Sequence, residues 1–73
     1  MGIRRYRIVI EETGTGFSAY SPDLDGCAST GHTREEVEKN MQEAIAFHLD
    51  GLRLEGMEVP DPHTYSTYIE VPA

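Results

Sequence analysis

Residues 33–56 read TREEVEKNMQEAIAFHLDGLRLEG, and this stretch predicts one long amphipathic helix. Its apolar side chains recur every three or four residues, which gathers them on one side of a helix with about 3.6 residues per turn. Thr33 and Glu36 have the spacing of a capping box, and Gly56 suits the position after a helix end near Leu54. The predicted core-facing stripe consists of Val37, Met41, Ala44, Ile45, His48, Leu49 and Leu52.

Short segments that read as strands flank this helix; all are rich in β-branched or aromatic residues except CASTG at 27–31, which has little side-chain bulk. Three precede it, at residues 3–11, 17–21 and 27–31, and the segment YSTYIEV at residues 65–71 follows it. The order β-β-β-α-β predicts a single α+β domain over residues 1–73, with a three-stranded sheet, the long helix packed on it, and a fourth strand. The side chains expected to meet the helix stripe are Tyr6, Ile8, Ile10, Phe17 and Ala19.

The turn PDLDG separates the second and third predicted strands. Pro22 ends the preceding strand because proline has no N–H to donate to a ladder. We expect Asp23 and Asp25 to accept hydrogen bonds from the backbone of their own turn, with Gly26 at positive φ. The alternative is a metal loop, because D-x-D-G resembles half of a calcium-binding loop. The other ligand positions of such a loop do not follow in the sequence, so we expect a structural turn and no metal.

The charge of the chain excludes several classes of partner. Six Lys and Arg against 13 Asp and Glu give a formal net charge of -7, and most of the excess lies in residues 33–73. Nucleic-acid binding needs basic residues that displace counterions from phosphates, and anionic membranes attract basic segments. We therefore expect neither partner, whereas a basic protein is electrostatically favoured. The absence of an apolar run of about 20 residues and of a signal peptide predicts a cytoplasmic protein.

Candidate catalytic groups do not form a recognisable constellation. His48 lies within the helix stripe, whereas His32 and His63 lie in predicted loops, and nothing in the sequence brings the three together. Cys27 is the only cysteine and has no basic neighbour, so we interpret it as a small buried hydrophobe. The chain also lacks a nucleophile motif and a glycine-rich phosphate loop. We therefore expect no enzymatic activity, no cofactor and no metal.

A second apolar stripe on the helix, together with the outer face of the sheet, suggests self-association. Phe47 and Leu54 lie away from the core stripe with Gly51 between them, and a glycine inside a helix costs about 1 kcal/mol relative to alanine. This stripe indicates either a wider contact with the sheet or a subunit interface. Val9 and Tyr20 would be exposed on the outer sheet face of a monomer, and a chain of 73 residues buries a small core. We expect an oligomer, with a dimer as the first choice.

Four segments, in this order and spacing, resemble the HicB-type antitoxin family. They are FSAYSPDLDGC at 17–27, GHTREE at 31–36, EAI at 43–45 and PDP at 60–62. None is specific alone, but their order and spacing together are, and the likeness covers roughly residues 6–62, which is most of the chain. The resemblance implies an antitoxin that binds a small basic ribonuclease of the HicA type, a toxin that cleaves mRNA with a histidine. Many HicB-type proteins also carry a C-terminal DNA-binding domain, but the residues after Pro62 read as a strand here, so we do not expect direct promoter binding.

The acidic helix face is the predicted site for such a toxin. The charge argument and the resemblance together favour Glu35, Glu36, Glu38 and Glu43 as contact residues, with the acidic stretch at residues 55–61 as a further contributor. The alternative for these glutamates is an ordinary solvated helix face. The alternative function is an orphan homo-oligomeric domain, with a structural or ligand-binding role and no toxin partner.

Overall fold

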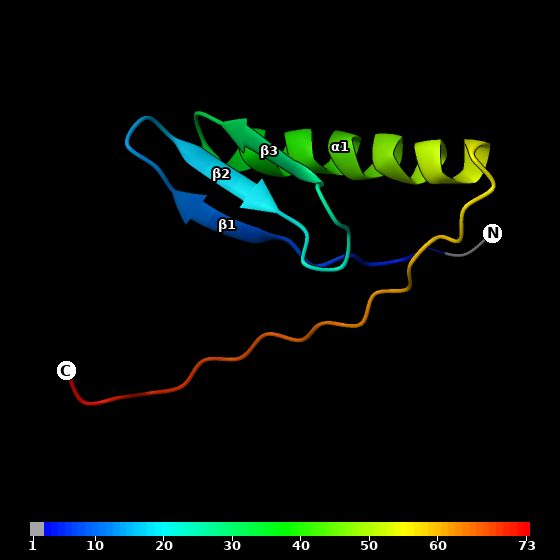
Figure 1. Cartoon of the computed structure of the whole chain (residues 1–73). Coiled ribbons are helices and arrows are strands. Elements are labelled where there is room, and N and C mark those ends of the chain that lie inside the picture. Colours follow the sequence, from blue (N-terminus) through cyan, green and yellow to red (C-terminus); the bar gives the residue numbers. More distant parts are fainter. Residues whose placement is uncertain (1–2) are drawn as a thin grey trace.

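The computed structural model describes residues 3–73 and contains a three-stranded antiparallel sheet covered on one face by a long helix (Figure 1). The strands are β1 (Val9–Glu12), β2 (Phe17–Tyr20) and β3 (Ala28–Gly31), and they lie side by side in that order. Helix α1 (Arg34–Leu54) follows β3 and extends beyond the end of the sheet. These four elements confirm the predicted α+β fold of a small sheet and one packed helix.

Both ends of α1 lie where the sequence places them. At the start, Thr33 Oγ1 accepts the Glu36 N–H at 3.0 Å. The Glu36 carboxylate reaches one residue further back than a standard capping box requires and accepts the His32 N–H at 3.0 Å. At the end, Gly56 has φ of 71° and donates its N–H to the Arg53 carbonyl at 3.0 Å, while Met57 donates to Leu52 at 2.9 Å. These two bonds form a Schellman motif, which needs a residue at positive φ.

The strand register decides which side chains meet the helix. Val9 lies opposite Tyr20, and Ile10 lies opposite Ala19. Successive side chains of a strand point to opposite faces, so Ile10 and Ala19 face α1 while Val9 and Tyr20 face outward. Ala19 is buried, and Ile10 packs against the same cluster. The assignment of faces made from the sequence is thus confirmed.

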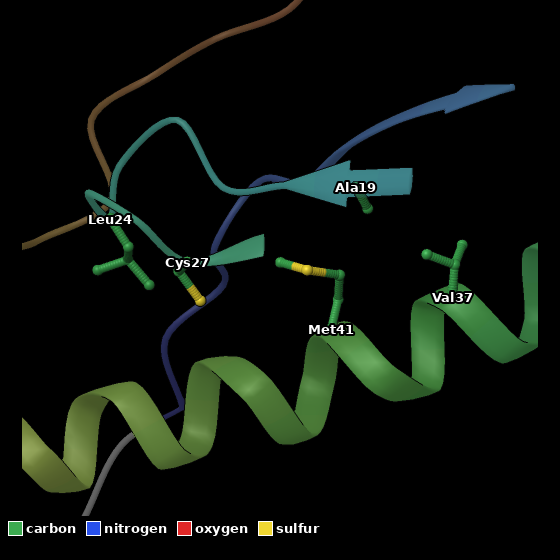
Figure 2. Packing of buried hydrophobic residues seen from close by; sticks show 5 residues of the cluster. All are labelled: Ala19, Leu24, Cys27, Val37 and Met41. Carbon is green, nitrogen blue, oxygen red and sulfur yellow. The ribbon is translucent and has the colours of Figure 1, made fainter. Parts of the chain in front are cut away.

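The core is a small cluster to which the helix, the sheet and the turn before β3 all contribute (Figure 2). Val37 and Met41 are the fully buried members of the predicted helix stripe, whereas Ile45 and Leu49 are only partly buried. Leu24, in the PDLDG turn, is buried as deeply as Val37 and Met41. Leu24 was not predicted from the sequence to be a core residue. The full cluster of buried apolar residues is Ala19, Leu24, Cys27, Val37 and Met41.

The single cysteine behaves as predicted from its sequence context. Cys27 is buried in the cluster beside Met41 and Leu24, and its thiol points into the core (Figure 2). Burial raises the pKa of the Cys27 thiol, because an apolar environment disfavours the charged thiolate. The side chain therefore serves as a small apolar core residue rather than as a nucleophile.

The predicted fourth strand is wrong for the described residues. No strand is present in residues 57–73, and the segment at 65–71 runs extended below the sheet without pairing with it (Figure 1). The predicted first strand is also too long, because β1 begins at Val9 rather than at residue 3. Residues 4–7 contact the tail through the side chains of Arg4, Tyr6 and Arg7, and no backbone ladder joins the two segments.

Candidate functional site

The four glutamates predicted to meet a basic partner are all exposed on α1. Glu36 is occupied by the helix cap, and Glu38 forms a loose ion pair with Arg34 at 4.0 Å. Within residues 3–73, Glu35 and Glu43 form no ion pair, so both carboxylates are available to a partner. Exposed pairs such as that of Glu38 contribute at most about 1 kcal/mol, and a partner's cation can replace them.

An acidic stripe with two large apolar side chains runs along the outer side of α1. Glu36, Glu43, Phe47, Asp50 and Leu54 are separated by seven, four, three and four residues, so they share one side of the helix, opposite the core stripe. Phe47 is 82% exposed and Leu54 is 88% exposed. The sequence left open a wider contact of Phe47 and Leu54 with the sheet, and their exposure shows that this contact is absent. We call this set the outer helix stripe.

An open groove lies between this stripe and the sheet. Its walls include Ala28 at the start of β3 and Ala44, Phe47 and Gly51 on the helix. A Cβ added at Gly51 would meet nothing within 4 Å, so the glycine leaves space that the chain itself does not fill. The groove thus offers an apolar recess directly beside acidic side chains, a combination suited to a partner that is both basic and apolar.

The five residues predicted for a subunit interface do not form one surface. Val9 and Tyr20 face each other across β1 and β2 on the outer sheet face, where Tyr20 is 44% exposed. Phe47, Gly51 and Leu54 lie on the helix, which covers the opposite face of the sheet. The structure therefore separates them into two surfaces, and self-association through either remains a prediction.

Asp23 has a different role from the one predicted. Its side chain is fully buried, and it bonds to residues far along the chain instead of to its own turn. Oδ1 accepts the His63 N–H at 3.1 Å, and Oδ2 accepts the Thr64 hydroxyl at 3.1 Å. The His63 ring nitrogen Nδ1 also lies 3.1 Å from Oδ1. Asp23 thus clamps the C-terminal tail against the body of the protein.

The remaining residues of the turn match the prediction in part. Gly26 has φ of 73°, as predicted, and Pro22 lies directly after β2. The turn is closed by backbone bonds, including Ser21 N–H to Cys27 O at 3.1 Å, rather than by aspartate side chains. Asp25 is exposed and is not among the side-chain hydrogen bonds of residues 3–73.

The basic cluster near the N-terminus is used within the chain. Arg7 donates from Nε and Nη2 to the Thr64 carbonyl at 3.2 and 3.1 Å, and from Nη1 to the Ser66 hydroxyl. Arg4 pairs with Asp61 at 3.3 Å. With the Asp23 clamp, these contacts hold residues 59–66, which we call the docked segment.

Other candidate sites are not supported in the described part of the chain. No group of three or more His, Cys, Asp and Glu side chains within residues 3–73 could hold a metal ion. His63 joins the Asp23 clamp, His48 lies on α1, and His32 precedes the helix cap, where its backbone rather than its ring is used. No helix in residues 3–73 is long and apolar enough to cross a bilayer.

The Asp23 clamp can be tested by substitution. Asp23→Ala should lower the free energy of unfolding by about 1.5–3 kcal/mol, because hydrogen bonds to a charged and buried acceptor are lost. The same change should release the docked segment, so that the His63 amide exchanges with solvent at least about 10-fold faster in NMR measurements. Asp25→Ala is the matched control, since this neighbouring aspartate is exposed. Equal effects of the two substitutions would contradict the clamp.

Comparison with known proteins identifies relatives over most of the chain. Residues 6–73 match the family described as HicB_like antitoxin of bacterial toxin-antitoxin system. The chain is 37% identical over 67 residues to an uncharacterized 14.9 kDa protein of Haemophilus phage HP1, covering 92% of this chain and 50% of that protein. It is 33% identical over 70 residues to Antitoxin HicB 2 of Photorhabdus laumondii, covering 94% of this chain and 50% of the relative.

A solved structure shares both the fold and the sequence. A chain of the HicA3 and HicB3 toxin-antitoxin complex superposes with a TM-score of 0.71 at 42% sequence identity, covering 82% of this chain and 70% of that one. The chain spans about half the length of the two relatives from the phage and from Photorhabdus. The shared region is therefore the sheet-and-helix domain described above, and it does not account for the whole of those longer proteins.

Proposed function

The chain belongs to the family of HicB_like antitoxins of bacterial toxin-antitoxin systems, and from this premise we propose that it neutralises a small basic ribonuclease of the HicA type by protein–protein contact. The observation that carries the proposal is the 42% identity with a chain of the HicA3 and HicB3 complex, because that relative is solved together with a toxin. This level of identity over 82% of the chain is high enough for a binding surface to be shared.

Charge supports this kind of partner. A ribonuclease presents a basic surface to the phosphates of RNA, and an acidic protein can occupy that surface in place of the RNA. The chain carries a formal net charge of -7, and Glu35 and Glu43 are free to pair. Complementary charge of this kind raises the rate of association and favours the correct partner over neutral ones.

Apolar burial has to supply most of the affinity, and the outer helix stripe provides it. Phe47 and Leu54 stand among the acidic residues of the stripe, and the groove at Gly51 lies alongside. Burial of an exposed aromatic at the centre of an interface contributes far more than a rim charge does. We therefore place the toxin contact on α1, with Phe47 as the anchor and glutamates around it.

The first experiment asks whether a toxin partner exists. The chain should be co-expressed with the small basic protein encoded beside it, and the two should co-purify as a complex. Added to that basic protein, the chain should abolish its cleavage of RNA. A neighbouring basic protein that neither binds nor is inhibited would contradict the antitoxin role.

A second experiment tests the location of the toxin contact. Glu35→Lys combined with Glu43→Lys should slow association at least about 10-fold at low salt, with little effect on the lifetime of the complex. The difference should shrink as salt rises, because exposed charges are screened. This pair leaves Glu36 in place, since its carboxylate is part of the helix cap. Glu11→Lys with Asp25→Lys gives the same change in charge away from α1 and should have a much smaller effect.

Phe47→Ala separates the apolar contribution from charge. Because Phe47 is 82% exposed, the substitution should leave the fold stable and accelerate dissociation of the complex by about 10- to 100-fold. The rates are measured by surface plasmon resonance or stopped flow. An unchanged dissociation rate would place the contact on another surface, even if the complex itself forms.

The second candidate function is an orphan homo-oligomeric domain with no toxin. The exposed apolar side chains at Tyr20 and Phe47, on two different surfaces, favour this reading because a monomer leaves both in water. Purification from the native host without any second protein, together with a defined oligomer, would support it.

A further inference from the structure

The segment after the docked residues is an extended arm that touches nothing. Residues 67–71, TYIEV, alternate and are rich in β-formers, yet Tyr68, Ile69 and Val71 are 72–100% exposed. The arm continues below the sheet, away from the body of the chain (Figure 1). We propose that the arm adds as a strand to the β1 edge of a second copy of this chain, and that the second copy returns its own arm, which closes a two-fold dimer.

The arm is poorly placed to pair with its own β1. Strands of a ladder lie about 4.8 Å apart and bond backbone to backbone. Here the guanidinium of Arg7 stands between the two segments, and the Thr64 carbonyl accepts its bonds from that side chain at 3.1 and 3.2 Å. The Arg7 side chain therefore separates the start of the arm from β1 of the same chain. The hydrogen bond from the His63 N–H to Asp23 holds the preceding residues in this position.

The β1 edge is the free edge of the sheet. At the other edge, Asn40 of α1 donates from Nδ2 to the Thr30 carbonyl of β3 at 2.8 Å, and α1 packs closely along β3. β1 pairs with β2 on one side, and no strand pairs with its other side within residues 3–73. The arm of one copy can therefore pair with the free β1 edge of another copy, which satisfies the unpaired backbone groups of both.

The exposed surface of the chain is larger than that of a compact monomer, as expected if part of it is covered in a dimer. The chain exposes 6126 Å², whereas a compact monomer of this mass exposes about 4,500 Å². Its radius of gyration is 14.1 Å, against about 11 Å for a compact chain of this length. The excess surface exceeds the roughly 800 Å² that each partner contributes to an interface of standard size. Reciprocal exchange of arms would cover surface of this extent and would stop at two copies.

The first test removes backbone donors from the arm. Tyr68→Pro with Ile69→Pro removes two neighbouring N–H groups without touching the core, because the arm makes no contact with it. Neighbouring N–H groups of a strand point to opposite sides, so one of the two is a ladder donor whichever side of the arm meets β1. Sedimentation should show the wild-type chain at twice 8.2 kDa at tens of micromolar. The double-proline variant should dissociate at least about 10-fold more readily, since two ladder bonds are lost per dimer. Tyr68→Phe with Ile69→Val is the matched control and should remain a dimer.

Two results of this test would overturn the proposal. One is a wild-type chain that stays at 8.2 kDa at these concentrations. The other is a dimer that the double-proline variant forms as tightly as the wild type, because such a dimer would use another surface, such as the one at Tyr20 or at Phe47.

The second test distinguishes exchange from pairing within one chain. A chain with Glu11→Cys on the β1 edge is mixed with chains that carry a cysteine at residue 67, 69 or 71, and the mixture is oxidised. Cys27 is buried and does not compete. A covalent heterodimer at one of these positions supports exchange. A chain carrying both cysteines that instead closes an internal disulfide, or no covalent product at any of the three positions, overturns it.

Discussion

Met41→Ala is expected to lower the free energy of unfolding by about 2–5 kcal/mol, through the loss of apolar burial and the cavity left behind. Met41 is 1% exposed and lies at the centre of the core, between Cys27 and Val37 (Figure 2). The buried cluster is small, so few neighbouring side chains can repack to fill the cavity. A domain of this length has a total stability of about 4–11 kcal/mol, and the substitution therefore removes a large part of it.

Urea denaturation followed by circular dichroism measures this effect, and Ile45→Ala is the control. Ile45 belongs to the same predicted helix stripe but is only partly buried, so its truncation should cost clearly less than that of Met41. Both measurements belong at one protein concentration, because self-association would add to the apparent stability. A loss below about 1 kcal/mol for Met41→Ala, or a larger loss for Ile45→Ala, would contradict the core as described.

Gly31→Ala should destabilise the fold by about 2–3 kcal/mol, because a Cβ at this position collides with backbone. The added atom would lie 2.6 Å from the Val37 nitrogen and 2.9 Å from its Cα. Backbone atoms in the first turns of α1 cannot move aside as the tip of a flexible side chain can. The end of β3 would have to separate from the helix, which loosens the contact that places Val37 in the core.

Gly14→Ala is the matched control for the collision. A Cβ at Gly14 would meet nothing within 4 Å, and its φ is not among the positive values. This substitution should be neutral or stabilising by up to about 1 kcal/mol, because it restricts the unfolded chain. Thermal unfolding of the two variants side by side measures the difference. Similar melting temperatures would mean that β3 and α1 are not in the close contact described.

The antitoxin proposal and the arm-exchange proposal are independent. A toxin complex that forms with a monomeric chain would support the first and overturn the second. A stable dimer that depends on the arm would support the second, and the assay with the toxin would still decide the first. The outer helix stripe and the arm lie on different elements, so variants of Phe47 and of Ile69 can be scored separately for each activity.

Some of the candidate site could be predicted from the sequence, because its residues lie on one element. The exposure of Glu35 and Glu43 follows from their position opposite the apolar stripe, which helical periodicity alone determines. The separation of Phe47 from Tyr20 also follows from the predicted faces, because Tyr20 lies on the sheet face that the helix does not cover, whereas Phe47 lies on the helix itself. The contact of Asp23 with the C-terminal tail could not be predicted from the sequence, because its partners are about 40 residues away and aspartates in turns usually bond locally.

The sequence by itself determined α1, its two caps, the three short strands and the alternation of faces in the sheet. These features depend on interactions within a few residues, such as the hydrogen bond from the Glu36 amide to Thr33 and the positive φ of Gly56. Only the tertiary structure decided that Leu24 completes the core and that residues 65–71 stay unpaired. A β-prone segment becomes a strand only when an edge lies within reach of its backbone, and the contact between Arg7 and Thr64 holds the tail away from its own sheet.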